Sequence, residues 1–440
     1  MRELRQGESQ KALIRWCHLQ LLYLLAYIWR WLLFRTTFIA ITGSVGKTTT
    51  KEYIAGIFSA HFSTAKTLYN QNDIYGVPQT ILRVRPWHRF AVVEIGTDRP
   101  GLISRSARLL RPDIAIVLAV ARTHTNIFLT LDDTATEKAH ILEALLPEGL
   151  AILNADDPRV QKMADSCRCR VKTFGRSAGL DLWADEVSSK WPARLTLRVH
   201  TESETQWVKT NLVGEHWVNS VLAALLAAIS CGIPLKAAAT ELERVKPFTA
   251  RMQPVLLPNG ATILRDEENG SPDTLRVALQ VLKESDAVRR LLVISDISDS
   301  HKRTHIRLRE VGKIASQVAD LVIFIGEHGH YAVKAATASG MKPECVLGFT
   351  DLYMASQYLK SELRSGDLVL LKGRTTDHLS RVFFAQFGTI GCWKTKCSKT
   401  IVCDLCEELR PEFDLQAIFN YEPEAIITES NFRSSDGQIP

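Results

Sequence analysis

The feature that most constrains this chain is a short loop between an apolar strand and a helix. The strand FIAIT begins at Phe38, the loop GSVGKTTT begins at Gly43, and the helical stretch KEYIAGIFSA follows. Backbone N–H groups of such a loop cradle phosphate, while Lys47 adds charge and the Thr48 hydroxyl a magnesium contact. Ile41 stands where the longer Walker motif has its first glycine, so the loop is a compressed TGxxGKTT type.

Apolar segments of strand length alternate with helical stretches along most of the chain. Further strands are expected at residues 91–97 and 113–120 and from residue 151, and a second alternating block follows Arg251. This alternation is typical of parallel strands covered by helices. We therefore predict an α/β protein: a P-loop-type central ATPase domain with a mainly parallel sheet, and a second, Rossmann-like α/β domain.

Composition agrees with a folded chain of several parts. Hydrophobic residues make up 46% and charged residues 23% of the 440 residues, which excludes a disordered or collagen-like chain. The expected parts are an apolar, basic-flanked helix (1–37), a central ATP-binding domain (38–251), a C-terminal α/β domain (252–390), a four-cysteine element (391–410) and a flexible tail (411–440).

The N-terminal segment carries most of the excess positive charge. The net charge is +6, and residues 1–37 hold six Lys or Arg against two Glu. This distribution argues against a basic nucleic-acid-binding domain, so we expect no nucleic-acid partner.

The same segment contains the run from Leu19 to Phe34, which is apolar apart from Gln20 and Arg30 and rich in Trp and Tyr. As a helix it would be about 24 Å long, short of the hydrocarbon core of about 30 Å. We predict an interfacial or re-entrant membrane anchor. The alternative is a helix buried against the protein or a partner chain, and a full span is the least favoured.

Nine cysteines are too few for a disulfide scaffold, and four of them cluster near the C-terminus. The spacing of Cys392, Cys397, Cys403 and Cys406 suits a structural Zn²⁺, with an iron–sulfur cluster or unligated thiols as alternatives. No small-residue cleavage site follows the apolar run, so we expect no signal peptide. The predicted location is cytoplasmic, peripheral to the inner face of the cell membrane.

The segment ITGSVGKTTTKEYI resembles the ATP loop of the Mur ligases, closest to the branch that adds D-alanyl-D-alanine to the muramyl tripeptide. Matching segments follow in the family's order over residues 38–390: NQNDIYGVPQTIL, VVEIGTDRPGLI, PDIAIVLAVARTH, EKAHI, LNADDP, EHWVNSVLAAL and LVLLKGR. In this family ATP phosphorylates a carboxylate, and an amine then displaces the phosphate.

The resemblance implies an ATP- and Mg²⁺-dependent carboxylate–amine ligase that acts in cell-envelope or related polymer biosynthesis. The alternative is a catalytically decayed ATP-binding regulatory or scaffold subunit. The compressed loop and the second α/β domain disfavour a P-loop kinase or a transport ATPase.

The resemblance also implies roles for individual residues. The catalytic residues would be Lys47, His124, Lys138 and Arg251. The nucleotide would be bound by Gly43, Ser44, Val45, Gly46, Lys47, Thr48, Thr49, His216, Asn219, Arg251, Asp266 and Asn269. Magnesium would be held by Thr48, Glu94, His124 and Lys138, the last of which is carbamylated in the family. The substrate would be contacted by Asn70, Asn72 and Lys372.

Four positions depart from the family's pattern. Asn126 and His140 stand where Glu is usual, and Arg265 and Glu268 replace Asp and Tyr. The apolar helix stands in place of the family's N-terminal UDP-sugar domain. We therefore expect the carboxylate to be presented on a lipid-linked, polymeric or protein-held acceptor.

Overall fold

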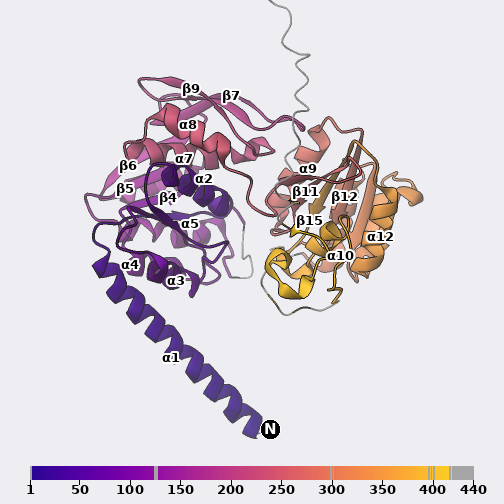
Figure 1. Cartoon of the computed structure of the whole chain (residues 1–440), viewed down its shortest axis with the longest axis horizontal. Coiled ribbons are helices and arrows are strands. Elements are labelled where there is room, and N and C mark those ends of the chain that lie inside the picture. Colours follow the sequence, from indigo (N-terminus) through magenta and orange to yellow (C-terminus); the bar gives the residue numbers. More distant parts are fainter. Residues whose placement is uncertain are drawn as a thin grey trace, which may run out of the picture.

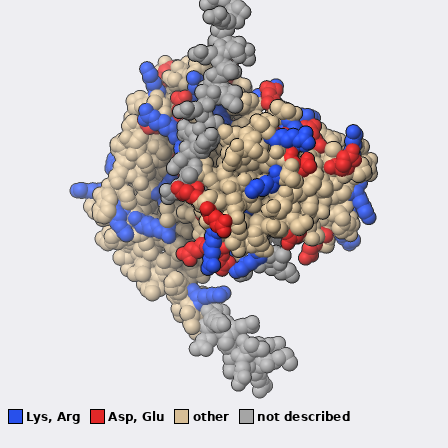
Figure 2. All heavy atoms as spheres, turned by 45° about the vertical axis from the view of Figure 1, so that its right-hand side comes forward, with Lys and Arg blue, Asp and Glu red and all other residues tan. Residues whose placement is uncertain are grey.

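A computed structural model describes residues 2–122, 127–297, 300, 302–394, 397, 399, 402–415 and 418, with side chains from residue 13 onward. Two α/β units lie side by side, and the long helix α1 projects from the first of them (Figure 1). Figure 2 shows acidic and basic side chains interspersed over the face that it presents. The predicted α/β architecture with two mainly parallel sheets is confirmed.

The first unit is built on a nine-stranded sheet in the order β2-β3-β1-β4-β5-β6-β7-β8-β9. Neighbouring strands run parallel from β2 to β7, whereas β8 and β9 are added antiparallel. The strands are β1 (Thr37–Thr42), β2 (Thr64–Lys66), β3 (Phe90–Glu94), β4 (Ile114–Val117), β5 (Leu150–Asn154), β6 (Arg170–Gly175), β7 (Leu182–Ser188), β8 (Thr196–His200) and β9 (Thr205–Lys209).

Helices cover this sheet on its two faces (Figure 1). They are α2 (Lys47–Ser59), α3 (Gly76–Arg83), α4 (Leu102–Leu110), α5 (Leu131–Ala139), α6 (Pro158–Lys162), α7 (Val218–Ser230) and α8 (Leu235–Arg244). Helix α7 has no charged residue and is buried over most of its length, because it packs against the sheet as well as α2 and α8.

The second unit is built on a six-stranded sheet in the order β10-β11-β15-β12-β13-β14. Only the edge strand β10 is antiparallel to its neighbour. Its strands are β10 (Gln253–Leu256), β11 (Thr262–Asp266), β12 (Arg289–Ile294), β13 (Leu321–Ile325), β14 (Val346–Phe349) and β15 (Asp367–Lys372). Its helices are α9 (Pro272–Glu284), α10 (Thr304–Ala315), α11 (Gly329–Ala338), α12 (Leu352–Glu362) and α13 (Ser380–Phe384).

Helix α1 (Arg2–Leu32) is longer than the apolar run that the sequence singles out. Only its C-terminal part contacts the first unit, where it lies against α3 and α4 (Figure 1). Within the described residues, no helix is both long enough and apolar enough to cross a membrane.

Candidate active site

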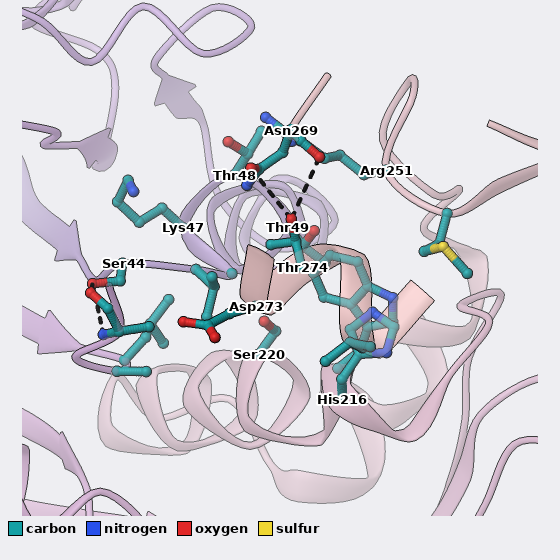
Figure 3. Close-up of a pocket in the computed structure, with 18 of the residues that line it drawn as sticks. Ser44, Lys47, Thr48, Thr49, His216, Ser220, Arg251, Asn269, Asp273 and Thr274 are labelled. Atoms are coloured by element: carbon teal, nitrogen blue, oxygen red, sulfur yellow. Dashed lines mark hydrogen bonds between the residues drawn. The ribbon is translucent and has the colours of Figure 1, made fainter. Parts of the chain in front are cut away.

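A cavity of about 340 Å³ lies between the two units. Its first wall comes from the loops after β1, β2 and β4, from the end of β3 and from the start of α7. Its second wall comes from β11, α9 and β15. Because the strands are parallel, their carboxyl ends deliver these loops to the same side of each sheet. Figure 3 shows residues from both walls directed at this space, with Lys47 facing it from one side and Arg251 and Asn269 from the other.

The phosphate loop closes the cavity at the start of α2. Gly46 is the N-cap of α2 with a φ of 84°, a left-handed conformation that favours glycine, and a Cβ there would lie 2.9 Å from the Ser220 hydroxyl. Lys47 Nζ donates a 2.8 Å hydrogen bond to the Gly43 carbonyl. The pKa of Lys47 lies below its usual value because the side chain is shielded from water, and the nearby carboxylate of Glu94 only partly opposes this shift. This lysine is a partly buried cation that lacks full hydration, beside the free N–H groups of a helix N-terminus.

A carboxylate lies next to the loop. Glu94, at the end of β3, is 1% exposed and accepts hydrogen bonds from the Thr48 hydroxyl at 3.0 and 3.2 Å and from Asn72 Nδ2 at 2.5 Å. A hydroxyl, an amide and a buried carboxylate with its charge only partly compensated make an oxygen-rich set that suits a hard cation such as Mg²⁺. The residues present therefore fit the metal that the resemblance implies.

Lys138 is placed behind this wall, on α5, and does not line the cavity. It is 3% exposed. Burial and the neighbouring charge of Lys47 lower its pKa to about 7, although Glu137 opposes this shift. Glu137 is itself engaged, since it accepts the N–H groups of Gly101 and Ile103 at the start of α4. A large fraction of Lys138 is thus an uncharged amine near neutral pH.

The second wall contains a buried ion pair. Lys372, at the end of β15, donates to Asp266 Oδ2 at 2.5 Å, and the Met252 N–H donates to Asp266 Oδ1 at 3.2 Å. Strand pairing sets this contact, because Asp266 and Lys372 are direct partners in the β11–β15 register. Arg251, at the connection between the units, also lines the cavity. Its positive charge repels that of Lys47 and attracts the carboxylate of Asp266.

The start of α7 brings buried polar groups without hydrogen-bond partners to the cavity. His216, Trp217 and Asn219 line it, and neither Trp217 Nε1 nor Asn219 Oδ1 has a hydrogen-bond partner among the described residues. Burial, together with the charge of Lys372, lowers the pKa of His216 to about 3, so the imidazole is neutral at physiological pH. A buried donor and acceptor without partners beside a neutral ring suit a nucleotide base.

Most of the residues that the sequence singles out line this one cavity. They are Ser44, Val45, Gly46, Lys47, Thr48, Thr49, Asn70, Asn72, Glu94, His216, Asn219, Arg251, Asp266, Asn269 and Lys372. Gly43 contributes its carbonyl to Lys47. His124 and Asn126 lie outside the described residues.

Sequence reasoning missed Ser220, Asp273 and Thr274, which also line the cavity. The Thr274 hydroxyl lies 3.4 Å from Asn269 Oδ1, and Ser271 caps α9 by accepting the Thr274 N–H (Figure 3). The Ser-Pro-Asp-Thr start of a helix, one residue beyond Asn269, is the signal that could have identified Asp273 and Thr274.

Two of the departures from the family's pattern have partners away from the cavity. Arg265 is fully buried and donates to Glu267 at 2.6 and 2.8 Å and to Asp404 at 2.7 and 3.0 Å. Asp404 belongs to the four-cysteine element, which is thereby joined to β11. The carboxylate of Glu268 accepts from the Thr375 hydroxyl at 2.9 Å, and burial raises its pKa to about 7.

The four cysteines surround a second, much smaller cavity together with His378. However, among the described residues no group of three or more His, Cys, Asp or Glu side chains is arranged to hold a metal ion. The thiols have separate neighbours instead: Cys403 Sγ lies 3.4 Å from His378 Nδ1, and Cys406 Sγ lies 3.7 Å from Lys399 Nζ. The structure therefore does not support the predicted zinc site.

Comparison with known proteins agrees with this geometry. The family model described as "Mur ligase middle domain" matches residues 41–228, and the one described as "Mur ligase, glutamate ligase domain" matches residues 250–375. The UDP-N-acetylmuramoyl-tripeptide--D-alanyl-D-alanine ligase of Mycobacterium bovis is 30% identical over 366 residues, which cover 79% of this chain and 72% of the relative.

This chain belongs to the Mur ligase family.

The enzyme of the same name from Escherichia coli K12 is 32% identical over 308 residues, 69% of this chain and 67% of the relative. A crystal structure of MurF from Acinetobacter baumannii superposes with a TM-score of 0.74 at 25% identity, covering 83% of this chain and 79% of that one. As a Mur ligase, the chain is an ATP-dependent enzyme that forms amide bonds, as its sequence predicts. Nothing in these comparisons favours the alternative of a decayed subunit.

Proposed function

We propose that this Mur ligase couples a peptide carboxylate of a cell-wall precursor to an amine through an acyl phosphate. A carboxylate oxygen attacks the γ-phosphorus of ATP, ADP leaves, and the amine then attacks the acyl carbon and releases inorganic phosphate. The observation that carries the proposal is the convergence of Lys47, Glu94, Arg251 and Lys372 from two separate sheets on one cavity. The named relatives join UDP-N-acetylmuramoyl-tripeptide to D-alanyl-D-alanine.

Each wall has its own part in this reaction. The N-terminal N–H groups of α2 and the ammonium of Lys47 bind the β- and γ-phosphates and stabilise charge that develops on the transferring group. Arg251 reaches the same phosphates from the second unit, where a planar and permanently charged donor suits them. Trp217 and Asn219 supply hydrogen bonds to the base.

Thr48 and Glu94 would hold Mg²⁺, which supplies charge neutralisation between the phosphates when it is bound. We also propose that Lys138 is carbamylated. Its neutral amine attacks carbon dioxide, an N–C bond forms and a proton is released, so that a buried neutral amine becomes a carbamate anion. The support is the pKa of about 7, which leaves the amine nucleophilic at neutral pH.

We propose the cytoplasmic face of the cell membrane as the place of reaction, with a lipid-linked carboxylate carrier as the acceptor. The support is the position of the C-terminal part of α1, which lies against α3. Asn70 and Asn72, on the substrate side of the cavity, lie in the loop that leads into α3, so a membrane bound by α1 would be close to the substrate.

The test is to trap the intermediate. Purified enzyme with ATP, Mg²⁺ and a carboxylate candidate is treated with hydroxylamine in place of the amine, and the mass of a hydroxamate is sought. UDP-linked and lipid-linked muramyl peptides are compared as carboxylates, and D-alanyl-D-alanine is then offered as the amine. Phosphate release that needs a carboxylate, with a hydroxamate of matching mass, is expected. ATP hydrolysis that is indifferent to every carboxylate would contradict the proposal.

A further inference from the structure

Helix α1 is apolar on two opposite faces. Its inner face, which includes Leu19 and Ala26 and continues into Leu33 just after the helix, is buried against the first unit. Its opposite face carries only apolar side chains between residues 21 and 32, each of them 48–57% exposed: Leu21, Leu24, Leu25, Ile28, Trp31 and Leu32. We call these six residues the outer stripe. They follow a helical period, so they form one continuous surface along a helix that projects away from the rest of the molecule (Figure 1).

The base of α1 is firmly attached. Trp29 Nε1 donates to the Val84 carbonyl after α3 at 2.8 Å, and the buried Arg30 donates to the carbonyls of Leu110 and Arg111 at 2.6 and 2.8 Å. The orientation of the outer stripe is therefore set by specific contacts on both neighbouring helices.

Arginines surround this attachment. The three packed segments 13–37, 76–89 and 101–112 contain nine Arg and no Asp, Glu or Lys. Arg15 lies further out along α1, Arg30 points inward, and Arg83 donates to Gln71 Oε1 at 2.9 Å. The other six form an arginine collar at the base: Arg35, Arg85, Arg89, Arg105, Arg108 and Arg111.

The collar is held close to α1. The Arg105 guanidinium lies 4.0 Å from the centroid of the Tyr23 ring, the Arg111 guanidinium lies 3.9 Å from that of Trp31, and Arg89 donates to the Arg35 carbonyl at 3.2 Å. The carboxylates of Asp73 and Asp113, whose charges act on Tyr23 and Arg30 at the attachment, accept the backbone N–H groups of Gly76 and Phe38 at 2.7 Å. The positive charge of the collar is thus left for an external partner.

We propose that the outer stripe and the arginine collar together form a docking surface for an anionic lipid membrane. The apolar stripe enters the boundary of the acyl chains, the rings of Trp31 and the exposed Trp87 lie at the level of the headgroups, and the collar binds lipid phosphates. A second copy of the chain fits less well, because a symmetric contact through the stripe would bring two arginine collars together.

The docking surface rests on the proposed location at the membrane and refines it, but its test does not depend on catalysis. The full-length protein, purified without detergent, is sedimented with vesicles of phosphatidylcholine alone or of phosphatidylcholine and phosphatidylglycerol in equal parts. We expect binding at least about tenfold tighter to the anionic vesicles, weakening as salt increases. Nucleotide binding, measured in parallel, reports on the fold.

Two pairs of variants separate the components. Leu24→Glu with Ile28→Glu, both outward-facing, should abolish sedimentation, whereas Leu146→Glu with Val288→Glu, at exposed apolar residues elsewhere, should not. Arg85→Gln with Arg108→Gln should weaken binding to anionic vesicles about tenfold and reduce its salt dependence. The matched control is Arg244→Gln with Arg276→Gln, two exposed arginines elsewhere.

Three results would overturn the proposal. They are a monomer that ignores both kinds of vesicle, a dimer that ignores vesicles and dissociates in the Leu24→Glu/Ile28→Glu protein, and vesicle binding that is indifferent to the arginine variants. An intact acyl-phosphate reaction in any of these cases would show that the docking surface fails independently of the proposed chemistry.

Discussion

The two walls of the cavity hold their lysines in opposite ways. In the first wall Lys47 donates to a neutral carbonyl at a helix N-terminus, and Lys138, whose pKa burial lowers to about 7, lies behind it. In the second wall Lys372 is already paired with Asp266 at 2.5 Å. In the first wall the charge of the lysine remains available for an anionic ligand. In the second wall the charge of the lysine is neutralised by a carboxylate on the neighbouring strand and stabilises the sheet. Substitutions in the first wall should therefore change turnover, and those in the second should also change unfolding.

The largest effect is expected for Lys47→Ala. Loss of charge stabilisation at the transferring phosphoryl group should lower ATP turnover by at least about 10³-fold, roughly 4 kcal/mol of barrier. The unfolding midpoint should change little, because the hydrogen bond of Lys47 goes to a neutral backbone carbonyl and Glu94 keeps its hydrogen bonds from Thr48 and Asn72. Coupled measurement of phosphate release and thermal unfolding checks this, with the exposed Lys66→Ala as a control. Normal turnover in Lys47→Ala would remove the assigned role.

Lys372→Ala tests the opposite wall. It leaves the carboxylate of Asp266 buried without its cation, which should lower the free energy of unfolding by about 3–5 kcal/mol. Urea unfolding of both single variants and of Lys372→Ala/Asp266→Ala completes the measurement. The double variant should be less destabilised than the sum of the singles, and strict additivity would show that the pair is not coupled.

Lys138→Ala should lower turnover about 10²-fold without removing nucleotide binding, because a group that orients the metal is lost. If the side chain is carbamylated, acetate or formate should restore part of the activity by occupying the vacated space. The same additions should leave Lys47→Ala inactive. Equal responses of the two variants would contradict a carboxylate-like role for Lys138.

The pH dependence of stability gives a second test of Lys138. Its pKa is about 7 in the folded state, below the value of about 10.4 in an unfolded chain. Between these values the unfolded state binds the extra proton, so the free energy of unfolding should rise as the pH increases from about 7 to about 10. Urea unfolding in buffer free of carbon dioxide should show this rise, and Lys138→Met should flatten it.

Asp404→Asn is expected to have the smallest effect. It keeps a side chain of the same shape next to Arg265 but removes one of two carboxylates, which should cost about 1–3 kcal/mol of stability. Nucleotide binding should not change, since the contact lies away from the cavity. Chemical denaturation checks this, with the exposed Glu407→Gln as the control variant. A loss of nucleotide affinity in Asp404→Asn would show that the C-terminal element acts on the site.

Much of the site was predictable because it is locally encoded. The loop from Gly43 to Thr50 needs a buried strand before it and a helix after it, and both are evident in the pattern of side chains. The order of matching segments then identified Glu94, Asn219 and Lys372, although no spacing rule could place them in one cavity.

The four-cysteine element marks the limit of such reasoning. Its spacing predicted a structural zinc site; the four thiols do surround one small cavity, but the described residues include no group arranged to hold a metal ion. Whether they also take up the geometry of a metal site depends on side chains such as His378 and Lys399, whose positions come from the packing of α13 and the loops after it.

The sequence alone determined the α/β class, the two alternating blocks and the phosphate loop, because these follow from hydrophobic period and from backbone geometry over a few residues. Only the tertiary structure decided that consecutive residues of β11 serve different purposes. Asp266 faces the cavity and meets Lys372, 106 positions away, whereas Arg265 faces the other side and meets Asp404, 139 positions away. Side chains alternate across a strand, but the residue that each of them contacts depends on how distant segments of the chain pack.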